Sequence, residues 1–478
     1  MMNLSINSGG VRGFRTKAKI KLSALAEQCE IEISILKQVE RGFLSLENSL
    51  AEKLSEIFKI SSNTIIESQK SFVARVIPGE GYTSSKVGSM GITYPTVELD
   101  PHDGRMKVLD IFCGAGGLSF GFEQTGKFVT VAGIDLLQDR IDTFTRNHPH
   151  AIGIAGDIKK ITPEDIQALI GKIDVLAGGP PCQGFSSIRP FRNLTENDPR
   201  NNLVEQYMLI LAQLKPNWFV FENVIGLLTH ESGSKLDIIL KEFSELGYVV
   251  EWRAMNAANF GVPQSRERIV IVGNRIGRKF EWPVPTHHFE YKSMAGNRSE
   301  IIRSKKDLFD QNELQPAVTL MEAIGNLPPL EAGEASNDYL KYSTSLYQTT
   351  IRNNASSLTW HRATRHSEKM LNIIKHAGSS IHDLPPGMVT SGFSSCYSRL
   401  DANRPSNTIT VNFVHPSSNR CIHPYQNRAL TPREGARLQS FPDTFVFAGS
   451  TAQTVKQIGN AVPPLLGQVL AEAISNQN

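Results

Sequence analysis

The 478-residue sequence predicts an α/β protein whose main body is a mostly parallel sheet, preceded by a small all-α module. Three observations predict this class. After residue 106, short apolar segments alternate with amphipathic helical segments, as in chains whose parallel strands are joined by helices. A glycine-rich turn links the first of these strands to a helix. Hydrophobic residues make up 40% of the chain, which is enough to bury a large core.

The composition narrows the range of functions. No apolar run reaches ~18 residues and the first residues lack a secretory pattern, so we expect no membrane span and a cytoplasmic protein. The five cysteines are few, odd in number and widely spaced, which favours a reducing compartment over a disulfide framework. The net charge of +3 neither requires nor excludes a nucleic-acid partner. Motifs must therefore decide the function.

Residues 1–75 predict a helical DNA-binding domain. A basic arm at 12–21 precedes short helical patterns that break at Cys29–Ile31. This stretch, over roughly residues 12–66, resembles the phage-repressor type of helix-turn-helix. The recognition helix would run from Glu32 to Glu40 and present Ser34, Lys37 and Gln38. Acids at its ends repel phosphate, so DNA binding would rest largely on the arm. The alternative is a packing or dimerisation bundle.

The rest of the chain divides into a linker and an interrupted α/β domain. Residues 76–105 are rich in Gly, Ser, Pro and Tyr and predict the linker. In the first part of the α/β domain, 106–279, strands are expected at 108–112, 129–135, 173–177, 218–221 and 268–272. Helical patterns at 203–214 and 235–246 lie between strands, which predicts a Rossmann-like sheet with right-handed crossovers. Residues 280–427 are rich in loops, and residues 428–478 return to helical periodicity.

The glycine-rich turn predicts a ligand site. It lies within Asp110–Ser119, where glycines let the backbone approach a ligand closely. Asp135 closes the second strand about 20 residues later, a spacing suited to an acid that binds ribose hydroxyls. Asp157 follows a third apolar stretch and could meet an adenine amino group. An adenosine-bearing cofactor fits this spacing, with a NAD enzyme or a tight turn without a ligand as alternatives.

A second group of reactive residues follows the later strands. Cys182 lies in a polar loop between Pro180-Pro181 and Gly184, and Glu222 ends the strand at 218–221. Both are expected at the carboxyl edge of the sheet, where open α/β folds bind ligands. A thiol there predicts a nucleophile, with a buried structural cysteine as the alternative. Arg266 and Arg268 precede the strand at 269–272, so in a parallel sheet they would reach the site only if the loop before them folded back.

Five blocks beyond the glycine-rich loop, in their order along the chain, resemble the DNA (cytosine-5) methyltransferase family. The resemblance covers residues 107–478 in blocks, apart from a stretch at about 280–427 that does not match. The blocks are Pro180–Gln183, Glu222–Val224, Gln264–Arg268, Arg428–Pro442 and Gln457–Pro464.

This resemblance implies a fold and a chemistry. The fold would be that of the class I methyltransferases that use S-adenosylmethionine. Cys182 would add to C6 of cytosine, so that C5 can attack the methyl group of S-adenosylmethionine. Glu222 would bind N3 and the exocyclic amine and supply a proton, Arg268 would hold the base oxygen, and Arg266 would help to order the site. Because this cannot occur within a stacked duplex, the cytosine must be flipped out. The base that removes the C5 proton is not identified, and water is an option.

The resemblance also implies cofactor contacts from both ends of the domain. They are Phe112, Ala115, Gly117, Asp135, Leu136, Asp157, Ile158, Pro181, Leu203, Asn460, Ala461 and Val462. Asp135 is shorter than the glutamate of many relatives, which would change the geometry at the ribose. Because Asn460 must reach the glycine-rich loop, we expect residues 428–478 to pack against the first part and complete one catalytic domain.

Residues 280–427 would then form the target-recognition domain. Loop side chains able to read base edges are Arg399, Arg404, Asn407, Thr408, Thr410 and Asn412, although a solvated surface explains each equally well. The histidines lack cysteine-paired ligand spacing, so no structural zinc is expected.

The leading interpretation is the modification methyltransferase of a type II restriction–modification system. Its partners would be double-stranded DNA, its own promoter through the N-terminal module, and a cognate restriction endonuclease that acts on the same site without a stable complex. A tRNA cytosine methyltransferase and a DNA-binding regulator with an inactive methyltransferase fold are the alternatives.

Overall fold

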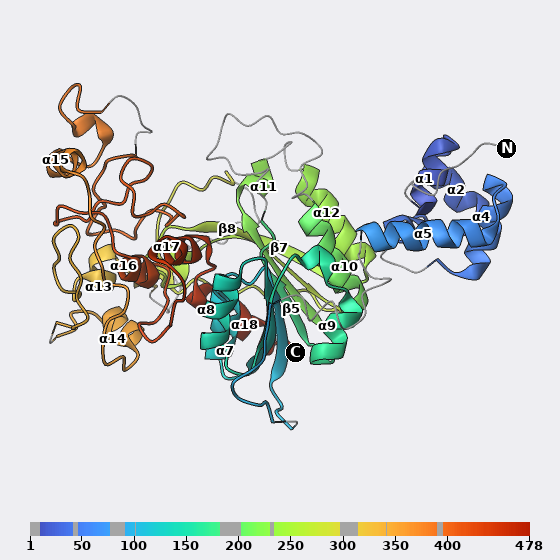
Figure 1. Cartoon of the computed structure of the whole chain (residues 1–478), viewed down its shortest axis with the longest axis horizontal. Coiled ribbons are helices and arrows are strands. Elements are labelled where there is room, and N and C mark those ends of the chain that lie inside the picture. The colour runs from blue at the N-terminus through green and yellow to red at the C-terminus, as the bar shows by residue number, and fades with distance from the viewer. Residues whose placement is uncertain are drawn as a thin grey trace.

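The computed structural model describes residues 10–41, 46–76, 91–100, 102–181, 202–229, 234–296, 314–340, 342–389 and 395–478. An eight-stranded sheet forms the centre of the molecule (Figure 1). Its strand order is β1-β4-β3-β2-β5-β6-β8-β7. Strands β4, β3, β2, β5 and β6 are parallel, whereas β8, β7 and β1 run antiparallel to their neighbours. The predicted α/β class is confirmed.

All five predicted strands are present. They are β2 (Met106–Ile111), β3 (Phe128–Asp135), β5 (Val175–Gly178), β6 (Trp218–Val224) and β8 (Glu267–Asn274). Three further strands of the eight-stranded sheet were not predicted from the sequence, namely β1 (Gly91–Thr93), β4 (Ile152–Ala155) and β7 (Val249–Asn256). β7 is an edge strand with half-buried Glu251, Trp252 and Arg253 at its centre, so it lacks the apolar run that marks a central strand.

Helices cover both faces of the sheet (Figure 1). One face carries α7 (Gly117–Gln124), α8 (Gln138–Asn147) and α18 (Pro464–Ser475), and the other carries α9 (Pro163–Ile170), α10 (Asn202–Leu214), α11 (Gly226–Thr229) and α12 (Ser234–Glu245). Because apolar side chains from both faces of the strands meet these helices, the strands are buried on both sides.

The C-terminal segment packs against the first part of the domain, as expected. Helices α7 and α18 share one apolar cluster that includes Leu118, Leu466 and Leu470. Glycines bring the two backbones together: a Cβ at Gly121 would collide with the carbonyl oxygen of Pro464, and one at Gly467 would lie 2.6 Å from the carbonyl oxygen of Leu118. Residues separated by more than 300 positions thus form one body beside the glycine-rich turn.

The N-terminal module consists of α1 (Gly10–Lys17), α2 (Leu22–Gln28), α3 (Ile33–Arg41), α4 (Asn48–Phe58) and α5 (Ser62–Val76), around a core of its own. The basic arm predicted at 12–21, before the first helix, is itself partly helical. Residues 10–17 form α1, because Val11 and Phe14 fall on one helical face and are buried. Arg15 is ion-paired with the buried Glu40 (Nε–Oε1 2.6 Å).

The predicted linker is shorter than residues 76–105. Gly91–Thr93 form β1, which pairs antiparallel with β4, and the following segment hydrogen-bonds to the carbonyl oxygen of Pro149 through the backbone N–H groups of Thr96 and Val97. No apolar alternation marks this edge strand in the sequence. No helix in the described part of the chain is long and apolar enough to cross a bilayer.

The region between residues 280 and 427 is rich in loops, as expected. Its short elements are β9 (His287–His288), β10 (Gln315–Pro316), α13 (Leu320–Ile324), α14 (Leu346–Arg352) and α15 (Glu368–His376). It shares one apolar cluster with α16 (Pro432–Leu438) and α17 (Thr451–Asn460), which lie beside it (Figure 1). The packing therefore continues across residue 428, where the sequence predicts a domain boundary.

Buried ion pairs hold α16 in this cluster. Arg428 donates through both Nη atoms to Glu434 (2.8 and 2.7 Å), and Arg437 donates to both oxygens of Asp443 (3.0 and 2.6 Å). The side chains of Arg428 and Glu434 are at most 1% exposed. Burial alone would raise the pKa of Glu434, but the charge and hydrogen bonds of Arg428 outweigh it and hold that pKa well below its usual range.

We expect Glu434→Gln to lower the free energy of unfolding by about 3–5 kcal/mol, because it leaves the buried Arg428 charge without its partner. The matched control is Glu322→Gln in α13. Glu322 has the same place in a capping box, but it is exposed and no arginine contacts it in the described structure. Its cost should stay below about 1 kcal/mol, because the capping interaction there is exposed and only partly removed. Urea unfolding measures both, and equal costs would contradict this account.

The same pair makes stability sensitive to acid. Because the folded pKa of Glu434 is depressed, its contribution is present above its unfolded pKa of about 4.3 and is lost as the pH falls. The wild type should therefore lose more stability between about pH 5 and about pH 3 than Glu434→Gln does.

Candidate active site

The carboxyl ends of the parallel strands bring the predicted site residues to one edge of the sheet. β2 ends at Ile111, β3 at Asp135, β4 at Ala155, β5 at Gly178 and β6 at Val224. Each is followed by one of the segments singled out in the sequence. Because β2 to β6 run in one direction, these segments share an edge, as open α/β sheets require of a ligand site.

The glycine-rich turn after β2 has an unusual backbone. Phe112 (φ 58°), Gly114 (φ 54°) and Gly116 (φ 85°) are left-handed, and Phe112 is not a glycine. A left-handed Phe costs on the order of 1–3 kcal/mol and persists where the surrounding structure fixes it, commonly at functional sites. Gly116 is the N-cap of α7, so the turn opens onto the N-terminus of that helix.

Asp135 closes over this turn from β3. Its Oδ2 accepts a hydrogen bond from the backbone N–H of Gly114 (3.0 Å), and its Oδ1 accepts one from Leu137 (3.1 Å). Burial raises the pKa of Asp135, against the opposing effect of these hydrogen bonds. The carboxylate is thus fixed against the loop, and its remaining lone pairs are available to hydroxyl donors.

The other predicted cofactor residues differ in exposure. Leu136 is 66% exposed, which is unusual for a leucine beside a buried sheet, and Asn460 is also exposed. Asp157 is half-buried and accepts a hydrogen bond from the backbone N–H of Lys159 (3.1 Å), which caps the short helix η1 (Ile158–Lys160). Ile158 is buried.

The C-terminal contribution reaches the turn as expected. Ala115 and Ala461 are buried, and the carbonyl oxygen of Val462 lies so close to Gly117 that a Cβ there would collide with it. Leu203, in the first turn of α10, is partly buried against the main core. The residues of the two sequence-distant blocks therefore meet at the turn.

The reacting end follows β5. Cys182 lies outside the described residues, since the described segment after β5 ends at the exposed Pro181. The backbone leading to it is fixed from β6: Asn223 donates from Nδ2 to the carbonyl oxygen of Pro180 (3.1 Å), and a Cβ at Gly179 would lie 3.0 Å from Glu222 Oε2. The sequence gives no sign of this role for Asn223, because an amide bound to a distant carbonyl leaves no local pattern.

Glu222 and Arg268 form an ion pair at the same edge, with Nε 3.1 Å from Oε1 and side-chain exposures of 13% for Arg268 and 12% for Glu222. Among the described residues, this buried oxygen accepts no hydrogen bond of normal geometry, although Arg268 lies beside it. Burial lowers the pKa of Arg268, and the Glu222 carboxylate opposes that effect. The ion pair therefore holds the Glu222 carboxylate at this edge of the sheet.

The loop before Arg268 does not need to fold back to bring this arginine to the site. β8 runs antiparallel to β6 and places Arg268 opposite Val224, so the entry of β8 lies beside the exit of β6. This antiparallel pair therefore brings the arginine to Glu222 directly. The sequence suggested the opposite edge because this strand was taken to run parallel to its neighbours.

Arg266 is buried and holds other segments of the chain together rather than facing Glu222. It is 3% exposed and donates to the carbonyl oxygens of Ile409 (3.1 Å) and Gly459 (3.5 Å). Burial lowers its pKa. Gln264 has a similar place, donating to the carbonyl oxygen of Leu438 (3.1 Å) and accepting from the backbone N–H of Ile409 (2.8 Å). This block joins the sheet, the insert and the C-terminal segment.

The six candidate base-reading residues divide into two groups. Arg399 donates to five oxygens inside the insert, Thr408 donates to the carbonyl oxygen of Ser265 (2.7 Å), and Thr410 donates to Asn419 Oδ1 (2.9 Å). These three are engaged in holding the fold. Three others are exposed, namely Arg404, Asn407 and Asn412.

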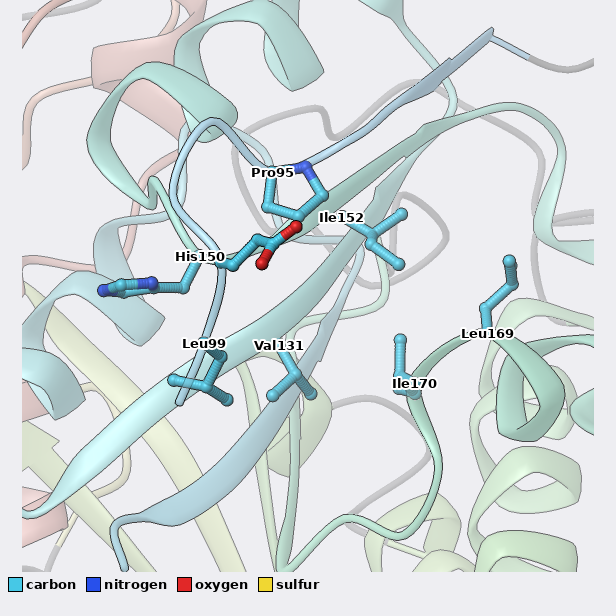
Figure 2. A pocket seen from close by; sticks show the side chains of 8 residues that line it. Pro95, Leu99, Val131, His150, Ile152, Leu169 and Ile170 are labelled. Atoms are coloured by element: carbon cyan, nitrogen blue, oxygen red, sulfur yellow. The ribbon is translucent and has the colours of Figure 1, made fainter. Parts of the chain in front are cut away.

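A cavity of about 300 Å³ lies elsewhere on the sheet (Figure 2). Its lining is mostly apolar: Pro95, Glu98, Leu99, Val131, His150, Ile152, Leu169 and Ile170. Val131 is in the middle of β3 and Ile152 at the start of β4, so the cavity is not at the carboxyl edge. None of the predicted site residues lines this cavity. We therefore assign the site to the carboxyl edge of the sheet, where those residues lie. Among the described residues no group of three or more His, Cys, Asp or Glu side chains is arranged to hold a metal ion.

Comparison with known proteins agrees with this geometry. A model of the C-5 cytosine-specific DNA methylase family matches residues 106–476, so the N-terminal module lies outside the match. The Type II methyltransferase M.AgeI of Thalassovita gelatinovora is 31% identical over 444 residues, covering 77% of this chain and 99% of that protein. M1.HphI of Haemophilus parahaemolyticus is 35% identical over 379 residues, covering 77% and 87%.

Solved structures support the same fold. A prophage-encoded E. coli protein described as a DNA modification methyltransferase has a TM-score of 0.58 at 25% identity, covering 78% of this chain and 99% of that one. DNMT2 of Spodoptera frugiperda has a TM-score of 0.50 at 18% identity, covering 77% of this chain and 99% of its own, and bears on the fold alone. The chain therefore belongs to the C-5 cytosine-specific DNA methylase family and is a DNA (cytosine-5) methyltransferase with a Rossmann-like class I methyltransferase fold.

Proposed function

We propose that this enzyme transfers a methyl group from S-adenosylmethionine to C5 of a flipped-out cytosine in a short duplex sequence, as the modification enzyme of a type II restriction–modification system. One observation carries the proposal: the Glu222–Arg268 pair lies beside the fixed Pro180 backbone that leads to Cys182, at the edge that also holds the glycine-rich turn. The Type II relatives support the restriction–modification assignment.

The residues at the turn fit S-adenosylmethionine. The left-handed glycines leave backbone room, Asp135 offers a fixed carboxylate for ribose hydroxyls, and Leu136 exposes an apolar side chain suited to an adenine ring. Asp157 and Ile158 would meet the base, and Pro181, Leu203 and Asn460–Val462 would complete the site. When bound, S-adenosylmethionine supplies an electrophilic methyl group on a sulfonium sulfur.

The chain's own residues would activate the cytosine. The Cys182 thiolate adds to C6 and forms a C–S bond, while Glu222 as a carboxylic acid gives a proton to N3. The ring would become an enamine with a nucleophilic C5, and the donor held by the residues of the turn would supply the methyl group, the new C–C bond at C5 replacing the S–CH₃ bond. A base then takes the C5 proton, the C–S bond breaks and the thiolate returns, with the N3 proton passing back to Glu222. Arg268 orients Glu222 and holds the base oxygen.

Transfer of labelled methyl groups tests this function directly. Purified protein with labelled S-adenosylmethionine should methylate duplex DNA, and bisulfite sequencing of DNA from expressing cells should find the methylated cytosines within one short sequence. Equal or greater labelling of tRNA would instead favour the RNA-modifying alternative. No labelling of either nucleic acid would favour the inactive regulator.

We also propose that the N-terminal module binds DNA near the protein's own gene and so regulates transcription. The basic residues Arg12, Lys17, Lys19 and Lys21 are exposed on α1 and the turn after it. In contrast, Lys37 of the predicted recognition helix α3 forms an ion pair with Glu245 of α12 (3.1 Å). The side chains of Ser34 and Gln38 lie outside the described part. The exposed cations of α1 and its turn therefore offer the better surface for phosphate.

Removing two of these cations should weaken promoter binding and spare catalysis. For Lys17→Gln/Lys21→Gln we expect affinity for the upstream DNA to fall about tenfold, and the salt slope to fall by about one for each phosphate that is no longer neutralised. Methyl transfer to the target duplex should not change. The control Lys172→Gln/Lys215→Gln removes two exposed lysines from the catalytic domain. Equal promoter binding by both double variants would remove the regulatory role.

A further inference from the structure

A buried polar network lies directly beneath the glycine-rich turn, and the proposed mechanism does not use it. It contains Asp110 from β2, Ser119 and Glu123 from α7, and His148 from the segment after α8. Ser119 and His148 are 0% exposed and Asp110 is 2% exposed. Because burying so many polar groups is costly unless they are paired, their arrangement needs an explanation.

Both ring nitrogens of His148 face oxygen atoms. Nδ1 lies 2.9 Å from Glu123 Oε2, and Nε2 lies 3.3 Å from the carbonyl oxygen of Gly116 and 3.4 Å from Ser119 Oγ. The Ser119 hydroxyl donates its hydrogen to Asp110 Oδ2 over 2.6 Å. The Glu123 carboxylate and the Gly116 carbonyl can only accept hydrogen bonds. The Ser119 hydroxyl already uses its hydrogen in the bond to Asp110, so toward the ring it too can only accept.

While Asp110 is ionised and accepts from Ser119, only the doubly protonated ring satisfies this arrangement. A neutral imidazole has one N–H and would turn a lone pair toward either Glu123 or Gly116. Burial lowers the pKa of His148, but the charge and hydrogen bond of Glu123 and the Gly116 carbonyl outweigh it, and the net direction is upward. For Glu123, burial raises the pKa, and His148 outweighs it to a net lowering. The directions for the two partners agree on an ion pair.

The ring is fixed and it touches the backbone of the turn. Phe144 stacks on His148 with ring centroids 4.4 Å apart. Gly116 is left-handed, and a Cβ there would lie 2.6 Å from His148 Nε2 and 2.9 Å from Phe144 Cδ2. The turn therefore rests on the imidazole ring, with the Gly116 carbonyl pointing at it and the next residue beginning α7.

We propose that His148 is a positioning residue for the methyl donor: held by Glu123, it fixes the Gly116 carbonyl and keeps the glycine-rich turn in the shape that receives S-adenosylmethionine. This inference rests on the proposed function, because that function assigns the ligand of the turn. As the pH rises, loss of the second ring proton removes the donor to Gly116. Because the folded pKa is raised, binding is complete below it and weakens as the pH rises through it.

Three other charged groups in and around this network could mask the effect. Asp110 faces the ring through Ser119, and burial raises its pKa to about 7 despite the Ser119 hydrogen bond and His148. Arg105 lies near Glu123, and Asp135 near Asp110. Asp110→Asn removes the neighbour whose pKa of about 7 could produce a break of its own, whereas Glu123→Gln removes the charge that holds the imidazolium.

The test is the pH dependence of S-adenosylmethionine binding to the full chain, measured by calorimetry without DNA from about pH 6 to about pH 9.5. We expect the wild-type Kd to rise about tenfold across one break as the pH increases, as loss of one charged hydrogen bond implies. The break should persist in Asp110→Asn and move to lower pH in Glu123→Gln. His148→Gln should raise Kd about tenfold at neutral pH and abolish the break, while kcat at saturating donor stays unchanged.

Controls separate positioning from general stability. His150→Gln alters a nearby half-buried histidine whose ring nitrogen contacts the Val97 carbonyl, and it should leave the profile unchanged. Thermal unfolding at each pH identifies any loss of fold. A wild-type break that vanishes in Asp110→Asn, or that does not move in Glu123→Gln, would overturn the role of His148. If the wild type binds no donor at any pH although nitrogen NMR shows the doubly protonated ring, the proposed function fails and this inference fails with it.

Discussion

Cys182→Ala should abolish methyl transfer to cytosine, lowering the rate by at least about 10⁴-fold, while S-adenosylmethionine still binds. Without the sulfur nothing adds to C6, and C5 remains too poor a nucleophile to attack the methyl group. Removing a nucleophile that forms the covalent bond typically costs this much or more. Transfer of labelled methyl groups to duplex DNA measures the rate, and calorimetry measures donor binding.

The matched control for this variant is Cys29→Ala. It removes a buried thiol from the N-terminal module, outside the family match, and should leave the rate unchanged. Retained transfer by Cys182→Ala would eliminate the nucleophile, whatever else the site does.

Glu222→Gln should lower kcat by about 10²–10⁴-fold, the range expected for loss of a positioned proton donor. The amide keeps the shape of the side chain but cannot give a proton to N3, and it leaves Arg268 without its charged partner. Single-turnover transfer at saturating DNA and donor separates this loss from any change in binding.

Glu251→Gln is the control for charge removal. Glu251 is on the edge strand β7 and pairs with Arg253 (3.6 Å), away from the carboxyl edge. It should retain nearly full activity. If both glutamine variants lose activity equally, the effect belongs to the stability of the sheet rather than to Glu222.

The sequence predicted the parts of the fold that have a local signal. Apolar runs located β2, β3, β5, β6 and β8, because a strand buried on both faces leaves an uninterrupted apolar segment. The packing of α18 against α7 followed from the expectation that Asn460 reaches the glycine-rich turn. The sequence missed β7 as a strand because an edge strand mixes charged and apolar residues.

The rest depended on relations between distant residues. The antiparallel pairing of β8 with β6, which brings Arg268 to Glu222, has no local signature. Arg399 is half-buried and donates to the carbonyl groups of several loops, so its residue type suggested a base reader where the fold uses it to hold those loops together. The contact of His148 with Gly116 likewise joins segments 32 positions apart. The role of Cys182 stays a prediction, since this residue lies outside the described part of the chain.

The most direct measurement is covalent trapping on a duplex in which the target cytosine is replaced by 5-fluorocytosine. Because C5 carries fluorine in place of hydrogen, no base can remove a proton there after methyl transfer. The C–S bond to the enzyme therefore cannot break. Peptide mapping of the complex formed with S-adenosylmethionine should find the DNA attached to Cys182, and Cys182→Ala should form no adduct. A stable adduct on another residue, or none from an enzyme that methylates the unmodified duplex, would contradict the account.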